Sequence, residues 1–179
     1  MLNVEIRRPR IEDSAQLNEF FKIVITDTFI QEGIGENLVD LNEEIKVKKQ
    51  YLESDFESNG EKRHFLIALH GNKIIGSIEY GPASNLINSC TDDALKELPE
   101  VGTVFVHPDF QRMGIGNLLL NKMYLILKNC EIEEFCLDSG YKRAQEIWKK
   151  KFGDPAYLLK NYWGEGYHHM IWRVKVSDL

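Results

Sequence analysis

One loop in this sequence has the residue types and spacing of an anion-binding site. It covers residues 111–116, follows the apolar segment 104–106, contains two glycines and opens a leucine-rich helix. Such a loop directs several backbone N–H groups and the positive end of the helix dipole at one point. Glycines are needed there because a Cβ would block the close approach of a phosphate. Arg112 adds a permanent positive charge, so the loop predicts a site for a phosphate group.

Two other phosphate-binding motifs do not fit this loop. A Walker loop requires a Gly-Lys pair, and the sequence contains none. A Rossmann fingerprint requires a third glycine or alanine where Leu119 stands, together with an early β-α-β unit that is not predicted here. An ordinary strand–turn–helix corner is the alternative interpretation of the two glycines.

The elements that must position this loop follow from the apolar periodicity, which predicts an α+β fold with a mixed central sheet. Strands are expected at residues 4–8, 64–70, 73–80, 100–106, 134–138, 157–162 and 169–176, and helices at about 13–28, 40–56, 116–128 and 141–151. Asp13 with Gln16 and Asp40 with Glu43 match capping boxes at the first two helices. The resulting order, β-α-α-β-β-β-α-β-α-β-β, has about seven strands and four helices, with room for one short helix near 92–98.

Composition limits the function further. The 179 residues carry 22 Lys+Arg and 28 Asp+Glu, a net charge of −6, which argues against a sequence-independent nucleic-acid binder. No run approaches the ~18 apolar residues of a membrane span, and the first residues lack the apolar stretch of a signal peptide. The three cysteines have no Cys-x-x-Cys spacing and are interpreted as reduced thiols, which favours a cytoplasmic protein: Cys90, Cys130 and Cys136.

The loop and its flanks resemble the acyl-CoA signature Gln/Arg-x-x-Gly-x-Gly/Ala of the GNAT N-acetyltransferase superfamily, including the lead-in Val106-x-Pro108. The resemblance extends to the element order and to Gly76 in the third expected strand, so it implies a single GNAT-like domain over residues 1–179. It implies that the CoA pyrophosphate is held by the loop residues, namely Gln111, Arg112, Met113, Gly114, Ile115 and Gly116. It also implies that the pantetheine arm pairs with the end of the preceding strand, namely Val104, Phe105 and Val106.

The activity implied by the resemblance is acetyl transfer from acetyl-CoA to a primary amine of a small molecule or peptide, by direct attack in a ternary complex. The amine must first lose a proton, because a lysine-like amine has a pKa of about 10.4. Glu100 is the candidate base, since its position eleven residues before Gln111 resembles that of the glutamate in the histone-type branch. Glu79 on the adjoining strand is the second candidate, and an exposed strand start after Pro99 is the alternative explanation of Glu100. The resemblance implies a backbone N–H of residue 105 or 106 as the donor to the oxyanion.

One helix departs from the family pattern. The family commonly carries Asn-x-x-Ala-x-x-x-Tyr there, whereas this chain has Tyr141 for the asparagine, Ala144, and Trp148 for the tyrosine. An indole cannot supply a proton at neutral pH, so the usual tyrosine acid is missing. Tyr141 is therefore a catalytic candidate, with packing or CoA contact as its alternative, and Trp148 is counted among the CoA-binding residues. This departure leaves a second function open, a catalytically impaired CoA- or acyl-CoA-binding regulatory module.

The charges are divided unevenly along the chain. Residues 1–140 carry 14 basic and 24 acidic side chains, and residues 141–179 carry 8 and 4. This division suits a cationic acceptor and an anionic cofactor, although solvated helix faces would give the same counts. His168 and His169 are adjacent and point to opposite sides of a strand, so no metal site is expected. A homodimer is compatible with the family by analogy alone.

Overall fold

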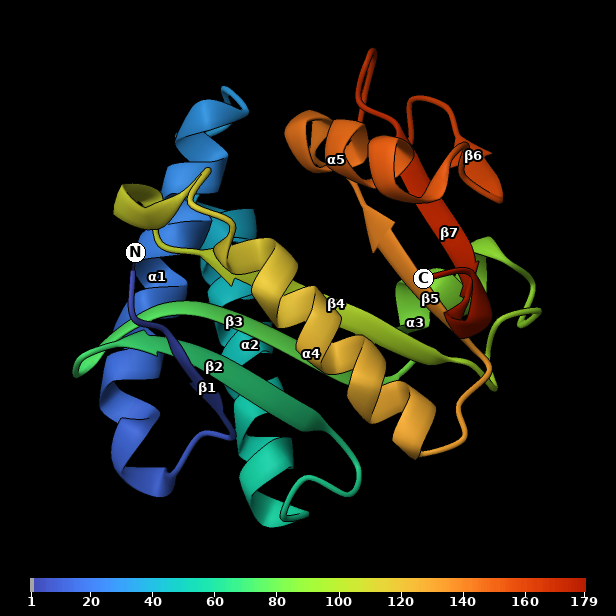
Figure 1. Cartoon of the computed structure of the whole chain (residues 1–179). Helices are drawn as coiled ribbons and strands as arrows, with labels where there is room; N and C mark the ends of the chain where they lie inside the picture. The colour runs from blue at the N-terminus through green and yellow to red at the C-terminus, as the bar shows by residue number, and fades with distance from the viewer. Residues whose placement is uncertain (1) are drawn as a thin grey trace. The chain divides into compact units, whose positions relative to one another are not determined.

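The computed structural model describes residues 2–179, and Figure 1 shows their helices and strands. The strands are β1 (Glu5–Arg7), β2 (His64–His70), β3 (Lys73–Pro82), β4 (Pro99–Val106), β5 (Glu134–Ser139), β6 (Tyr157–Leu159) and β7 (His169–Lys175). The helices are α1 (Ser14–Gln31), α2 (Leu38–Glu57), α3 (Asn85–Cys90), α4 (Ile115–Asn129) and α5 (Lys142–Phe152). The seven strands form one mixed sheet in the order β1-β2-β3-β4-β5-β7-β6, which confirms the predicted α+β fold.

Strand pairs β1–β2, β2–β3, β5–β7 and β6–β7 are antiparallel, and β4 and β5 pair in parallel, with Glu100 opposite Cys136. By contacts between residues, the chain divides into two compact units. The first unit contains residues up to Tyr80 and Thr103–Ile126, and the second contains Gly81–Gly102 and Leu127–Leu179.

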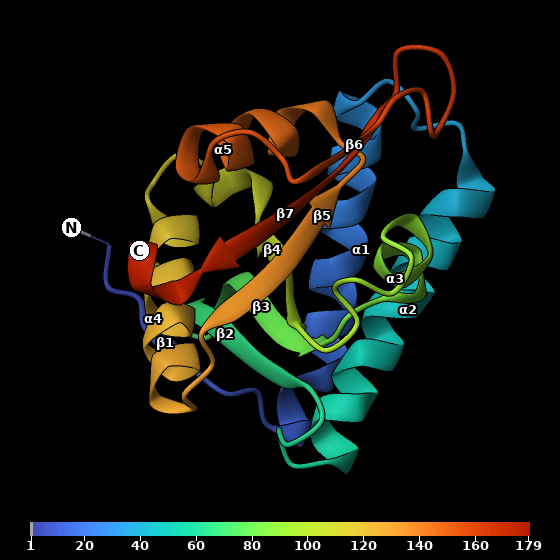
Figure 2. The same cartoon turned by 90° about the vertical axis from the view of Figure 1, so that its right-hand side faces the viewer.

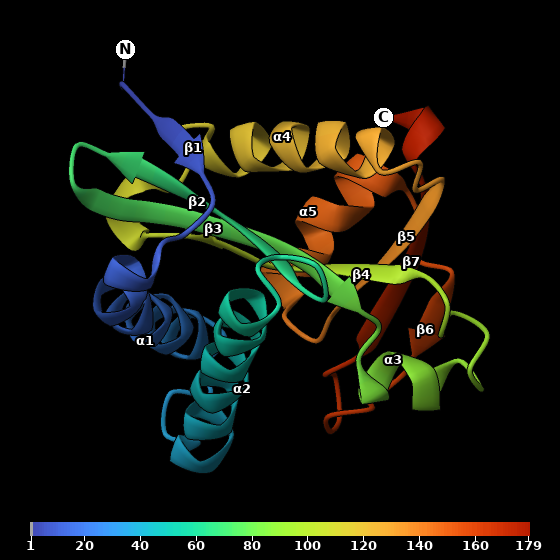
Figure 3. The same cartoon turned by 90° about the horizontal axis from the view of Figure 1, so that it is seen from below.

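In the first unit, α1 and α2 cover one face of strands β1–β3, and α4 covers the other face (Figure 3). The buried side of α1 explains its position, because Phe21 packs against both Phe65 of β2 and Phe105 of β4. On the α4 side, Gly76 of β3 lies directly under the helix. A Cβ at Gly76 would come within 2.9 Å of Leu119 and 3.0 Å of Ile115, so the missing side chain lets α4 approach the sheet closely.

In the second unit, α3 and α5 lie on opposite faces of β5 and β7 (Figure 2). Ile87 of α3 belongs to a buried cluster with Cys136 of β5 and Ile171 of β7. On the other face, Phe152 of α5 contacts Phe135 of β5 in a T-shaped ring pair with centroids 6.2 Å apart. The alternation of side chains along β5 therefore separates the two faces.

Two local predictions were wrong. The short helix of the 81–98 connection is α3 at Asn85–Cys90 rather than near 92–98, because the Ser84 side chain caps it and Asp92 and Asp93 adopt positive φ. The strand predicted at 157–162 ends at Leu159. The backbone of Asn161 has a φ of 55°, which is incompatible with an extended strand.

Neither predicted capping box forms. The carboxylate of Asp13 pairs with Arg7 at 2.7 Å and accepts the backbone N–H of Arg10, and its side chain does not cap α1. Gln16 instead accepts the backbone N–H of Ile74 in the β2–β3 hairpin. Helix α2 begins earlier than predicted, because Asn37 is its cap. Gln16 thus binds a residue distant in sequence, whereas the cap of α2 is a local residue three positions before the predicted one.

Among the helices within residues 2–179, none has the length and apolar character needed to cross a membrane. The same residues contain no group of three or more His, Cys, Asp or Glu side chains that could hold a metal ion.

Candidate active site

The predicted anion-binding loop lies in the first unit, between β4 and α4, and its middle is exposed. Gly114 has a φ of +83°, and a Cβ built on it would meet nothing within 4 Å. The glycine is therefore required by the backbone conformation, which L side chains rarely adopt. The backbone of Arg112 also has a positive φ, of 62°. These two left-handed residues precede α4, which begins at Ile115, and the first N–H groups of a helix have no partner within it.

The strand end before the loop is fixed by two contacts within the first unit. His107 donates its backbone N–H to the carbonyl of Ile75 at 2.9 Å, which continues β4 alongside β3. The side-chain amide of Gln111 donates to the carbonyl of Val106 at 3.4 Å, so Gln111 ties the loop to the strand. Burial, and then the charge of Lys73, lowers the pKa of His107 below its ordinary value. A neutral imidazole there accepts the backbone N–H of Asp109.

Glu79 lies in a buried ion pair. Its side chain is 1% exposed, and its Oε2 atom is 2.6 Å from Nη1 of Arg63. Its other oxygen, Oε1, accepts the hydroxyl of Thr103 at 3.1 Å. The guanidinium of Arg63 stacks over the ring of Tyr51, 3.7 Å from its centroid. Both oxygens of Glu79 are thus engaged, and the carboxylate holds Thr103 in place.

Thr103 has an unusual backbone for a residue inside a strand. Its φ is 50°, a conformation that is rare for a β-branched residue. Ser77 donates its hydroxyl to the carbonyl of Thr103 at 2.9 Å, and Glu79 holds the Thr103 hydroxyl. Two buried side chains of β3 therefore fix the irregular point of β4 that immediately precedes residues 104–106.

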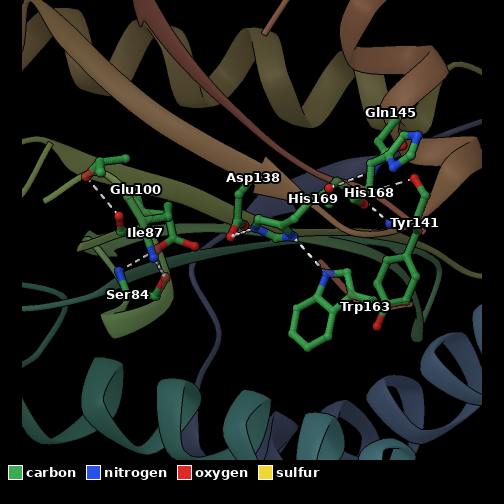
Figure 4. Close-up of polar contacts among 11 residues, drawn as sticks. Ser84, Ile87, Glu100, Asp138, Tyr141, Gln145, Trp163, His168 and His169 are labelled. Atoms are coloured by element: carbon green, nitrogen blue, oxygen red, sulfur yellow. Dashed lines mark hydrogen bonds and ion pairs between the residues drawn. The ribbon is translucent and has the colours of Figure 1, made fainter. Parts of the chain in front are cut away.

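Glu100 belongs to the second unit and is 9% exposed, so it is not an exposed strand start. Its Oε2 atom accepts the backbone N–H of Ser84 at 2.7 Å, at the beginning of α3 (Figure 4). Across the parallel pair it lies opposite Cys136. Burial, and after it the negative charges of Glu100 and Asp138, raise the pKa of the Cys136 thiol to about 12.

Tyr141 and Trp148 also belong to the second unit. Tyr141 is the residue before α5, and its backbone N–H is bound by the hydroxyl of Ser139. Trp148 is buried and stacks on Phe152, with ring centroids 5.8 Å apart and an interplanar angle of 14°. The structure therefore places Trp148 in the apolar packing of α5. The basic residues Lys149–Lys151 form the last turn of the same helix.

One polar cluster of the second unit was not predicted from the sequence. Trp163, His169 and Asp138 form a chain of hydrogen bonds from the loop between β6 and β7 to strand β5 (Figure 4). From the sequence, His169 was considered only with His168 as a metal ligand, and no metal site was expected. Its partners depend on which residues of β5 and β7 are paired, and no local pattern reveals that pairing.

The predicted residues thus fall into two groups. In the first unit, Glu79 lies on β3, residues 104–106 end β4, and the loop follows them before α4. Glu100, Tyr141 and Trp148 lie in the second unit.

Comparisons with known proteins identify the family of this chain. The model of the acetyltransferase (GNAT) family matches residues 21–154, whereas a comparison with curated proteins gives no match. The solved structure of a "putative acetyltransferase of the GNAT family" from Desulfovibrio desulfuricans has a TM-score of 0.72 and 16% identity, over 97% of this chain and 99% of that one. PaiA N-acetyltransferase from Thermoplasma acidophilum, solved with coenzyme A, has a TM-score of 0.68 and 21% identity, over 97% and 99%.

Ribosomal-protein-alanine N-acetyltransferase from Brucella melitensis has a TM-score of 0.68 and 18% identity, over 96% of this chain and 99% of that one. At these identities the likeness to the solved structures concerns the fold. The family match covers most of the chain and includes the strand, loop and helix described above. The chain belongs to the acetyltransferase (GNAT) family.

Proposed function

We propose that this protein is an acetyl-CoA-dependent N-acetyltransferase, with residues 1–179 acting as one domain. It transfers an acetyl group to a primary amine of a small molecule or peptide, by direct attack in a ternary complex. The observation that carries the proposal is the exposed loop at the start of α4, in a chain of the GNAT family.

The loop fits the diphosphate of acetyl-CoA. The N–H groups at the start of α4 supply donors at the positive end of the helix, and Arg112 supplies a cation. Residues 111–116 bind the pyrophosphate in this proposal, and residues 104–106 pair with the pantetheine arm. A backbone N–H of Phe105 or Val106 then donates to the oxyanion that forms on the thioester carbonyl.

Of the two glutamates predicted as bases, Glu100 is proposed because its spacing before Gln111 resembles that of the family's glutamate, although it also accepts the Ser84 N–H. Both oxygens of Glu79 are used by Arg63 and Thr103, so protonating Glu79 would break a buried bond. We therefore propose Glu100 for proton removal and Glu79 as a positioning residue that holds Thr103.

Direct attack agrees with the state of the buried thiol. The pKa of Cys136, raised to about 12 by burial, keeps this thiol protonated at neutral pH. A protonated, buried thiol is a poor nucleophile, so an acyl-cysteine intermediate at Cys136 is disfavoured. The amine then attacks the thioester carbon, the C–S bond breaks, and CoA leaves as thiolate.

Protonation of the departing thiolate is the step for which Tyr141 is proposed. Replacing Tyr141 with phenylalanine is expected to lower kcat and leave the KM of acetyl-CoA unchanged, because only the phenol is lost. Steady-state kinetics check this, and an unchanged kcat would remove Tyr141 from the mechanism.

The acceptor is proposed to be a cationic amine. Residues 1–60 carry 13 acidic and 7 basic side chains, a field that attracts amines. One structural neighbour is described as a ribosomal-protein-alanine N-acetyltransferase, which makes the amino group of an alanine-terminated peptide one acceptor to test.

The loop assignment is tested with a matched pair of glycine variants. Gly114 and Gly71 both have positive φ, and a Cβ at either meets nothing within 4 Å. Gly114→Ala is expected to raise the KM of acetyl-CoA about tenfold or more, because the loop amides move away from the phosphates. Gly71→Ala, in the β2–β3 turn, strains the backbone similarly and leaves this KM unchanged. Equal effects of the two variants would refute the loop assignment.

The second candidate function is a CoA- or acyl-CoA-binding module without catalysis, and the burial of Trp148 at the usual tyrosine position favours it. Thiol release from acetyl-CoA, measured against a panel of amines, separates the two functions. Binding of CoA by the wild-type chain and its loss in Gly114→Ala, without turnover on any amine, would support the module.

A further inference from the structure

Three side chains of the second unit form a hydrogen-bonded chain that the proposed reaction has not used. The indole Nε1 of Trp163 donates to Nδ1 of His169 at 3.1 Å, and Nε2 of His169 lies 2.9 Å from Oδ2 of Asp138 (Figure 4). His169 is 3% exposed, whereas Trp163 is 54% exposed. The chain therefore runs from a strand carboxylate, through a buried imidazole, to an indole at the surface.

The indole fixes the protonation of the imidazole. An indole nitrogen only donates, so Nδ1 of His169 must offer a lone pair. The imidazole proton then resides on Nε2 and is donated to Asp138, which holds both the ring orientation and the tautomer. As a result, His169 presents one hydrogen-bond acceptor, Nδ1, toward the loop between β6 and β7.

Negative charge lies beside the ring of His169, because Asp138 contacts its Nε2 atom. Asp138 is two residues along β5 from Cys136, so both side chains are on the same face of the strand. Glu100 is the register partner of Cys136 across the parallel strands, so its side chain lies on the same face. From the loop, the ring of Tyr162 also faces His169, with centroids 5.7 Å apart.

Trp163 sits over a residue without a side chain. A Cβ at Gly140 would lie 2.7 Å from Nε1 of Trp163 and 3.5 Å from Nδ1 of His169. Because Gly140 has no side chain, a nitrogen atom can lie beside it within hydrogen-bonding distance of Nδ1 of His169. In the structure, the nitrogen in that space belongs to the exposed indole.

We propose that Nδ1 of His169 binds an N–H of the acceptor amine, and that the indole N–H of Trp163 occupies this position until the amine displaces it. Asp138 is a positioning residue that keeps Nδ1 unprotonated. The identification of the ligand as the acceptor rests on the proposed acetyltransferase function.

The first test observes binding without turnover. The chain has three tryptophans, so its ¹H–¹⁵N spectrum has three indole resonances, and Trp163→Phe identifies that of Trp163. The probes are an alanine-terminated peptide, an alkyl diamine and an aminosugar, added without acetyl-CoA. At least one probe is expected to shift the Trp163 indole resonance in the wild type and to leave it unmoved in His169→Gln. If no probe moves it, the proposal fails.

The second test uses two variants that remove the same indole hydrogen bond in different ways. Trp163→Phe deletes the competing N–H and leaves the space open, so the KM of the amine is expected to fall about two- to tenfold. Gly140→Ala places a methyl group in the space that the amine nitrogen needs, so this KM is expected to rise about tenfold or more. The KM of acetyl-CoA stays unchanged in both variants.

Opposite signs distinguish a ligand site from a structural role, because a merely structural bond would make both variants change the amine KM in the same direction. A shared direction, or no change in either variant, would overturn the proposal. Failure of the proposed function has a different signature. An amine that moves the Trp163 resonance but is never acetylated would leave the binding site standing and refute the transferase.

Discussion

Replacing Glu79 with glutamine removes one charge from a buried ion pair without changing the shape of the side chain, and we expect it to destabilise the protein by about 3 kcal/mol. Two unit charges about 4 Å apart attract one another by about 4 kcal/mol at an effective dielectric constant of 20. A glutamine amide can keep a neutral hydrogen bond to Arg63, which returns about 1 kcal/mol. The Arg63 side chain is only 8% exposed, so water cannot solvate its unpaired charge.

Thermal and urea unfolding measure this loss. For a chain of this length, about 3 kcal/mol corresponds to a fall in Tm of roughly 6–12 °C. A matched control is Glu134→Gln, which breaks the exposed ion pair with Arg173 and should cost less than about 1 kcal/mol. The double variant Arg63→Met, Glu79→Leu removes both charges, so its loss of about 1–3 kcal/mol should come from the Thr103 hydroxyl left without its partner. A loss below about 1 kcal/mol in Glu79→Gln would refute the calculation.

Three further predictions concern other contacts. The hydrogen bond from Arg7 lowers the pKa of Asp13, so its stabilising effect is present above the ordinary carboxyl pKa and lost as pH falls through the lowered value. Urea midpoints of the wild type and Asp13→Asn should therefore differ at pH 7 and converge in acid, and a constant difference would contradict this. The thiol of Cys136, whose pKa burial raises to about 12, should react with iodoacetamide at pH 8 only after unfolding, while the exposed Cys130 reacts in the native protein. Gln16→Ala removes two hydrogen bonds to the β2–β3 hairpin and should cost about 1–3 kcal/mol in urea unfolding, whereas a neutral effect would mean that water replaces the amide.

The elements predicted best are those whose signals are local. An apolar run bounded by turn residues predicted β2 correctly, and the pair of glycines predicted the start of α4. Both signals are local, because the length of a strand and a left-handed backbone depend on adjacent residues. The start of α3 was misplaced because Ser84 caps it and Glu100, distant in sequence, binds the Ser84 N–H.

The contacts of the candidate site were harder to predict than its residues. Glu79 was recognised as a carboxylate on the correct strand, but its pairing with Arg63 and Thr103 depends on the register of three strands. Likewise, His169 meets Asp138 only because β5 and β7 pair with Asp138 opposite Ile171. A shift of one residue would turn either side chain to the other face, and no short pattern specifies the register.

The left-handed backbone of Thr103 has a thermodynamic consequence for any ligand of the adjoining strand. Such a conformation costs a non-glycine residue about 1–3 kcal/mol, and here the contacts of Thr103 with Ser77 and Glu79 offset that cost during folding. A ligand that pairs with residues 104–106 therefore meets a backbone that has already been bent and ordered. In terms of binding thermodynamics the strand is preorganised, so little of the ligand's interaction free energy is consumed in shaping its site.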